Sequence, residues 1–196
     1  MGLKTLVVVV GPEGTGPDAV AEHVAASLGI PVWTCPNVPH SLNGDAYGAL
    51  LFAATNRAVW LAKALAHDAP EVAVASGWWH DTYAASVSVE GHGVLFNNAL
   101  RMLALAENTR WANVFRTVLI ILDAPDDALA AVTGRPTERA LKVRDYLRTT
   151  GFADDETYRV RLSGVEGSTW AALRADVVRV VEGYARTTPA LPRNGT

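Results

Sequence analysis

Cysteine and long apolar runs are scarce in this sequence, and each scarcity excludes a class of protein. The single cysteine, Cys35, rules out an internal disulfide framework and a multi-cysteine zinc site, and it suits a reducing compartment. A small buried hydrophobic side chain is the plainer role for that residue. The longest apolar stretch, residues 46–66, contains Asn56, Arg57 and Lys63, so it is not expected to span a membrane.

Lysine is also rare, and basic residues are not in excess. The lysines are Lys4, Lys63 and Lys142. Because 17 Lys and Arg stand against 20 Asp and Glu, the net charge is −3, and no basic field is available to attract nucleic acid. No targeting segment is predicted, since Lys4 precedes only a short apolar run, and a cytoplasmic location is expected.

The length of the chain sets its domain organisation. A chain of 196 residues suits one α/β domain with a sizeable core. We expect that domain to cover residues 1–186, and we expect residues 187–196, which are polar with prolines and a glycine, to form a disordered tail.

What the sequence does contain begins with an apolar strand that runs into a glycine-rich turn. Leu6–Val10 is short and β-branched, as in a buried parallel strand. Pro17 then fits the first position of a helix that should end at Gly29. This order, together with the spacing of Gly11 and Gly16, is that of a phosphate-binding P-loop. An ordinary turn between a strand and a helix is the alternative.

Two positions of this turn depart from the P-loop pattern. The lysine that normally reaches the β- and γ-phosphates is replaced by Pro17, and the Ser or Thr that holds Mg²⁺ is replaced by Asp18. Proline supplies no charge and removes one backbone N–H from the anion nest. Asp18 can bind Mg²⁺, because hard cations favour carboxylate oxygen, although its charge also repels phosphate.

Strands and helices are expected to alternate along the rest of the chain. Strands are predicted at residues 31–34, 71–75, 117–122 and 159–162, and helices at 46–67, 94–110, 126–133 and 170–184. The arginine-rich stretch 134–148 is expected to be partly helical. This alternation predicts a three-layer α/β fold, with a mainly parallel sheet covered by helices on both faces. Ligands of such sheets bind at the carboxyl ends of the strands.

Five segments, taken in their order along the chain, carry a resemblance that none of them carries separately. They are LVVVVGPEGTG at residues 6–16, LLFAATNRA at 50–58, VASGWWHDTYAA at 74–85, ILDAPDDALA at 121–130, and an arginine-rich stretch ending in VRDYL at 143–147. Together they resemble the thymidylate kinase family of P-loop nucleoside-monophosphate kinases, over about residues 5–185. The resemblance implies a P-loop NTPase-type fold, a nucleotide- or nucleoside-type ligand, ATP and Mg²⁺ as cofactors if the chain is active, and a homodimer.

The resemblance also implies roles for particular residues. The phosphate-binding set is Gly11, Glu13, Gly14, Thr15, Gly16 and Asp18. Arg57 matches the family arginine that contacts the acceptor phosphate, and the alternative is a solvated helix arginine. Asp123 is a second candidate Mg²⁺ ligand, or a cap for the following helix.

A lid is expected at about residues 134–150. Arg135, Arg139 and Arg144 are its candidates for contact with the transferred phosphate, and Lys142 is the one lysine placed to replace the missing charge. The alternative is a solvated basic helix whose cations pair with Glu138 and Asp145.

A substrate pocket is expected after the strand at 71–75, and its candidates are Trp78, Trp79, His80, Thr82 and Tyr83. Aromatic rings there can stack on a base or a sugar. His80 beside Asp81 can act as a general base. The alternative is that the rings close the floor of the pocket and the histidine lies at the surface.

The family's Asp-Arg pair at this strand end falls on Ser76 and Gly77, so its charges are missing along with the loop lysine. Phosphoryl transfer depends on positioning and charge neutralisation. Two hypotheses therefore stay open. The chain is either an atypical phosphotransferase acting on a nucleotide or a related small substrate, or a pseudokinase that serves as a regulatory subunit or as the partner of an active relative.

Overall fold

The computed structural model describes residues 4–12, 14–34, 46–66, 70–77, 98, 101–103, 105–106, 109, 111–133, 138–149, 156–162 and 167–187. The strands are β1 (Lys4–Val10), β2 (Val32–Thr34), β3 (Val72–Ser76), β4 (Phe115–Asp123) and β5 (Glu156–Arg161). The helices are α1 (Pro17–Leu28), α2 (Ala46–Leu65), α5 (Asp126–Thr133), α6 (Glu138–Thr149) and α7 (Gly167–Thr187).

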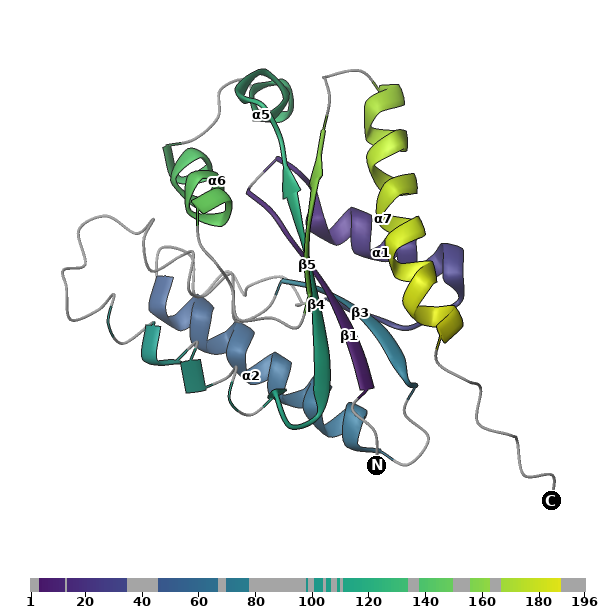
Figure 1. Cartoon of the computed structure of the whole chain (residues 1–196). Coiled ribbons are helices and arrows are strands. Elements are labelled where there is room, and N and C mark those ends of the chain that lie inside the picture. Colours follow the sequence, from purple (N-terminus) through teal and green to yellow (C-terminus); the bar gives the residue numbers. More distant parts are fainter. Residues whose placement is uncertain are drawn as a thin grey trace.

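The strands form one five-stranded parallel sheet in the order β2-β3-β1-β4-β5. The central strand β1 places Val9 opposite Ser76 of β3, and Val10 opposite Ile121 of β4. The carboxyl ends of these strands therefore meet at one edge of the sheet, where the loop that leads into α1 also lies (Figure 1). The predicted α/β class with a parallel sheet is confirmed.

Helices cover both faces of the sheet. Alternate residues of β1 serve the two faces: Val7 and Val9 belong to the core under α1, α5 and α7, whereas Val8 and Val10 belong to the core under α2 and α6. Each buried valine contributes about 1.5–3 kcal/mol relative to exposure. Figure 1 shows the resulting three layers, with α1 and α7 on one side of the sheet and α2 on the other.

An aromatic cluster sets the orientation of α2. Trp60 stacks on Trp33 of β2 with ring centroids 6.3 Å apart, and Trp33 meets Phe115 edge-on at 5.7 Å. Trp60 and Ala64 are buried on the inner side of α2. Since residues three apart share a helix face, Arg57 also turns inward, and it is only 3% exposed.

A second polar and aromatic cluster joins the edge strand β5 to α7. The hydroxyls of Tyr158 and Tyr184 both donate to Glu156 Oε2, the former at 2.7 Å, and Arg116 forms an ion pair with Glu156. Arg116 also lies 5.6 Å from the centre of the Tyr184 ring. Burial, followed by these hydrogen bonds, raises the pKa of Tyr184, and the two tyrosine hydroxyls lower the pKa of Glu156.

The observed boundaries differ from the expected ones mainly toward the end of the chain. Strand β5 begins at Glu156 and ends at Arg161, and α7 extends to Thr187, where the expected tail begins. The remainder of that tail, 188–196, lies outside the described residues. The expected lid contains α6, a regular helix. None of the described helices combines the length and the hydrophobicity needed to cross a bilayer.

Candidate functional site

The loop between β1 and α1 has the backbone of a tight, glycine-dependent turn. Gly14 and Gly16 adopt φ values of 95° and 61°, in the left-handed region that favours glycine. Thr15 donates to the carbonyl of Pro12 twice, through its backbone N–H at 3.1 Å and through Oγ1 at 2.7 Å. Within the described residues, the N–H groups of Gly14 and Gly16 donate to no backbone carbonyl, so they are available to an anion.

The loop is also wedged between two neighbouring elements. A Cβ on Gly11 would lie 2.3 Å from Thr15 Oγ1 and 3.0 Å from Leu122 Cβ, so only glycine fits there without rearrangement. A Cβ on Gly14 would lie 3.5 Å from Leu129 Cδ2 of α5. The loop therefore lies directly against the end of β4 and against α5.

Helix α1 starts as the sequence predicts, with Pro17 at its first position and Gly16 as an N-cap that has no side-chain hydrogen bond. Asp18 stands in the first turn, where its charge suits the helix dipole. Its carboxylate accepts a hydrogen bond from Ser76 Oγ, at the end of β3. Asp18 is exposed and Ser76 is buried, so the pair lines the edge of the sheet with the carboxylate outermost.

This pair has the two side-chain types of the usual P-loop metal site in exchanged positions. In P-loop proteins the first helical turn supplies a hydroxyl and a strand end supplies a carboxylate, and together they hold Mg²⁺. Here Asp18 places the carboxylate on the helix, and Ser76 places the hydroxyl on the strand. The next residue, Gly77, has a φ of 69° and donates its N–H to Val9 O at 3.1 Å, so an arginine there would be strained.

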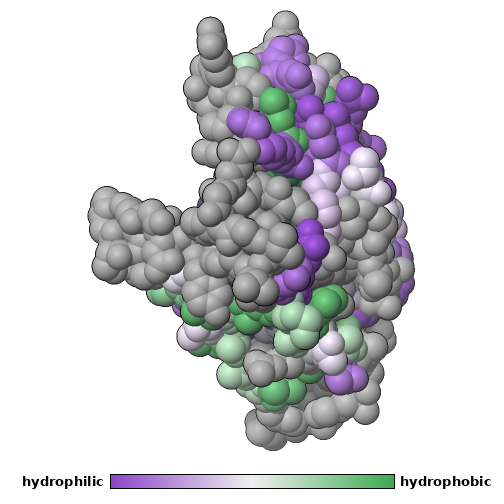
Figure 2. All heavy atoms as spheres, turned by 90° about the vertical axis from the view of Figure 1, so that its left-hand side faces the viewer, coloured by the Kyte–Doolittle hydropathy of each residue, from purple (hydrophilic) through white to green (hydrophobic). Residues whose placement is uncertain are grey.

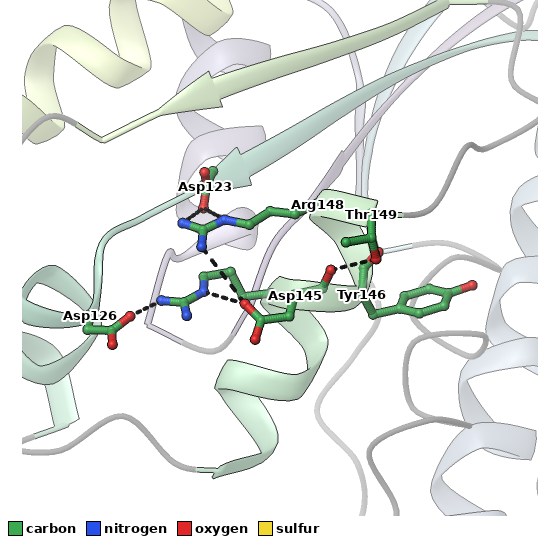
Figure 3. A network of polar contacts seen from close by, with 7 residues as sticks. Asp123, Asp126, Asp145, Tyr146, Arg148 and Thr149 are labelled. Atoms are coloured by element: carbon green, nitrogen blue, oxygen red, sulfur yellow. Dashed lines mark hydrogen bonds and ion pairs between the residues drawn. The ribbon is translucent and has the colours of Figure 1, made fainter.

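An alternating chain of charges fastens α6 to the end of β4 (Figure 3). Arg144 pairs with Asp126 at the start of α5, and its Nε lies 3.2 Å from Asp145 Oδ1. Arg148 lies 3.8 Å from the same Asp145 oxygen, and it donates to Asp123 Oδ1 through Nε at 2.9 Å. The network thus runs from the start of α5 through α6 to the end of β4, which neighbours the end of β1.

Two members of this network have pKa shifts, and both shifts favour the charged form. Hydrogen bonding from Arg144, followed by its positive charge, lowers the pKa of Asp126. Burial by itself would lower the pKa of Arg144, but hydrogen bonds to Asp126 and Asp145 outweigh it and raise that pKa. Arg144 and Arg148 of α6 are therefore both paired with carboxylates of the chain itself.

The other candidate cations occupy different environments. Lys142 Nζ lies 2.9 Å from Glu138 Oε1, one turn away on α6, as the alternative of a charge-paired lid helix predicts. Arg57 is buried on the inner side of α2. Arg139 belongs to α6, but its side chain lies outside what is described.

The expected substrate pocket cannot be placed in the same way. Trp78, Trp79, His80, Thr82 and Tyr83 all lie outside the described residues, as do Glu13 of the loop and Arg135 of the lid. Their assigned roles stay predictions.

The two candidate metal ligands differ in their availability. Mg²⁺ is commonly held by one or two carboxylates together with waters and substrate phosphates, and Asp18 with Ser76 can supply such a partial site. The Asp123 carboxylate is instead occupied by Arg148. Among the described residues, no three His, Cys, Asp or Glu side chains form a complete metal cluster.

Three residues of this site were not singled out from the sequence: Asp126, Arg148 and, as a partner of Asp18, Ser76. The contact of Ser76 with Asp18 had a signal in the sequence, because a hydroxyl and a carboxylate have exchanged places between the end of β3 and the first turn of α1. For Asp126 and Arg148 the sequence contains no such signal. An arginine near the end of a basic helix is usually solvated, and so is an aspartate at the start of a helix.

No protein-family model matches the sequence, and no curated protein matches it. Solved structures do match. A thymidylate kinase from Ehrlichia chaffeensis is 15% identical, with 91% of this chain and 99% of that chain covered and a TM-score of 0.57. A thymidylate kinase from Candida albicans is 14% identical, with 94% of each chain covered and a TM-score of 0.59. A sugar kinase from a Janibacter species is 12% identical, with 94% and 99% covered and a TM-score of 0.53. The chain therefore shares the fold of these P-loop kinases.

Proposed function

We propose that this protein binds a nucleotide- or nucleoside-type ligand at the loop between β1 and α1, together with Mg²⁺, and that any phosphoryl transfer it performs is atypical. The contact between Asp18 and Ser76 carries the proposal. If the loop had only lost its metal-binding groups, nothing would keep a hydroxyl and a carboxylate paired at these two positions. The pair retains both oxygen donors of the usual site in reversed places.

The backbone of the loop supports the same proposal. Gly14 and Gly16 keep the left-handed conformations that leave their N–H groups available, and α1 begins at the loop. A helix N-terminus and such N–H groups favour an anion. Mg²⁺, held through Asp18, would neutralise the phosphate oxygens that Asp18 by itself would repel.

The second substrate is proposed from Arg57, from the aromatic residues after β3 and from the similar structures. Arg57 is proposed to hold the acceptor, with the aromatic residues around Trp78 and Trp79 closing the pocket. Two of the similar structures are thymidylate kinases and one is a sugar kinase. We therefore propose that the acceptor is either the phosphate of a nucleotide or the hydroxyl of a related small substrate such as a sugar.

Calorimetry with ATP and with deoxynucleoside monophosphates, each with and without Mg²⁺, tests this function. We expect a dissociation constant in the millimolar range or tighter for at least one of them, with Mg²⁺ strengthening ATP binding. Asp18→Ala should remove the Mg²⁺ dependence, whereas Asp176→Ala should not, because Asp176 pairs with Arg179 on α7. Affinity weaker than millimolar for every ligand would overturn the proposal.

A pseudokinase is the second candidate, and the charges of the lid favour it. Pro17 removes the lysine, and Arg144 and Arg148 are both paired with carboxylates, so the described site presents few available cations to a transferred phosphate. Ligand binding without turnover in a coupled phosphotransfer assay would select this candidate.

A homodimer is also proposed, and α2 offers a surface for it. Leu51, Val59 and Leu65 are 39%, 51% and 65% exposed, and at 100° per residue they lie within an arc of about 120°. Figure 2 shows the side of the molecule on which α2 lies, with apolar side chains gathered in its lower part and hydrophilic ones mainly above them. Sedimentation equilibrium checks the oligomeric state directly.

A further inference from the structure

The loss of the loop lysine raises the question of which cation can reach a phosphate at this site. Arg148 is the described residue in the best position. Its Nε and Nη2 lie 2.9 and 2.8 Å from the same oxygen of Asp123, at the carboxyl end of β4. Parallel neighbours are about 4.8 Å apart, so the end of β4 adjoins the end of β1, where the loop begins. Leu122, beside Asp123, packs against Gly11 of that loop.

Arg148 is also held less firmly than the other described cation of the network. The Arg144 side chain is 9% exposed and has two carboxylate partners at hydrogen-bonding distance. The Arg148 side chain is 34% exposed, and its second partner, Asp145, is 3.8 Å away. It extends from the last turn of α6, so its guanidinium can exchange one anion for another without moving the helix.

A third arginine can stabilise Asp123 if Arg148 leaves it. Arg161 of β5 is the register partner of Asp123, and side chains of paired residues in a parallel sheet project from the same face. The side chain of Arg161 is exposed, and among the described residues it forms no side-chain hydrogen bond or ion pair. The Asp123 side chain is only 16% exposed, so a replacement cation would spare it the cost of being left partly buried and unpaired.

We propose that Arg148 supplies the positive charge missing from the phosphate loop: Asp123 holds it in the ligand-free protein, and a phosphate draws it away while Arg161 takes its place on Asp123. The inference rests on the proposed function for the identity of the phosphate-bearing ligand. It differs from the expectation for Lys142, which pairs with Glu138 on α6.

Inorganic pyrophosphate, which carries no base or sugar, is the probe, and EDTA removes divalent cations from the assay. We expect Arg148→Gln to weaken pyrophosphate binding about tenfold or more, as the loss of a charge-assisted contact requires. Asp123→Asn should strengthen binding about threefold, because Arg148 is then released from its competing anion. That gain should vanish in the double variant Asp123→Asn/Arg148→Gln.

Further variants separate charge from structure. Arg148→Lys keeps the charge and should keep most of the affinity, and Arg179→Gln on α7 should leave it unchanged. The ¹⁵N-resolved Nε–H signal of Arg148 should shift on addition of pyrophosphate. Arg161→Gln should reduce the affinity for pyrophosphate, because no arginine can then replace Arg148 on Asp123. Thermal melts show whether each variant is folded, and the Arg148→Lys result stands if Arg148→Gln does not fold.

The outcomes distinguish this inference from the function on which it rests. Pyrophosphate binding that depends on Arg148, with no affinity for any nucleotide, would support the inference and overturn the proposed function. Nucleotide binding that is indifferent to Arg148 would do the reverse. The inference is overturned as well if Asp123→Asn weakens pyrophosphate binding, or if pyrophosphate binds to none of these proteins.

Discussion

Exchanging the side chains of Asp18 and Ser76 tests the most informative contact in the site. The variants are Asp18→Ser, Ser76→Asp and the double variant that carries both changes. The double variant restores the usual order, with a hydroxyl on the helix and a carboxylate on the strand. If the two side chains act as a pair, the double variant should be more stable than the two single effects imply.

The expected sizes follow from burial and charge. A hydrogen bond to a charged group contributes about 1.5–3 kcal/mol, and because Asp18 is exposed we expect Asp18→Ser to cost about 1 kcal/mol. Ser76→Asp brings two carboxylates together, and two like charges 4 Å apart repel by about 1 kcal/mol in water and about 4 kcal/mol at an effective dielectric constant of 20. Because Ser76 is buried, a cost of about 3 kcal/mol is expected. The double variant should lose only about 1 kcal/mol, a coupling of about 3 kcal/mol.

Urea unfolding followed by circular dichroism measures these free energies, and repeating it with Mg²⁺ adds a second readout. Ser76→Asp places two carboxylates at one edge of the sheet, so Mg²⁺ should raise its midpoint more than that of the wild type. Asp176→Ser, at a surface ion pair of α7, is the matched control. Effects that add within about 0.5 kcal/mol would show that the two side chains do not interact, and the observation that carries the proposed function would fall.

Two further predictions concern the loop and the C-terminal helix. Gly11→Ala should destabilise the protein by about 1–3 kcal/mol, because its Cβ would lie 2.3 Å from Thr15 Oγ1. Adding Thr15→Ala should recover part of that loss in urea titrations. If Gly11→Ala costs the same free energy with and without Thr15, the prediction is wrong. Tyr184→Phe should cost about 1 kcal/mol through the lost hydrogen bond to Glu156. Because the folded protein raises the pKa of Tyr184, its contribution is complete below the pKa of an unfolded tyrosine, about 10, and is lost as the pH rises above it. The stability difference between the two proteins should therefore shrink in alkaline melts, and a difference that stays constant up to high pH would contradict the assignment.

Local signals were sufficient for the first third of the fold. Helix α1 occupies Pro17–Leu28, as predicted, because proline at its start and Gly29 after its end act through local backbone chemistry. Strand β5 was harder to delimit. It begins at Glu156 rather than near Arg159, because polar residues lie on an edge strand and the Tyr158 and Tyr184 contacts that hold it come from residues distant in sequence.

The candidate site likewise combines residues that a local pattern predicts with contacts between residues that are distant in the sequence. The glycines, Pro17 and Asp18 could be assigned from the order of residues within one turn. The contact of Asp18 with Ser76 spans 58 residues, and that of Arg148 with Asp123 spans 25, so neither follows from local pattern. Such contacts depend on how the strands are ordered in the sheet, which periodicity does not specify.

The structure links two of the departures from the P-loop pattern and leaves the third, Pro17, without a counterpart. In the sequence, Asp18 and Ser76 appear as two separate departures from the P-loop pattern, but their contact joins them into one exchange that keeps a carboxylate and a hydroxyl together. Pro17 has no such complement within the described part of the loop, so the proposed function needs a positive charge from another element. Arg148 is held by a single close carboxylate, Asp123, at the end of the strand that neighbours β1. The proposed phosphate binding therefore depends less on the loop than on whether α6 can release that arginine.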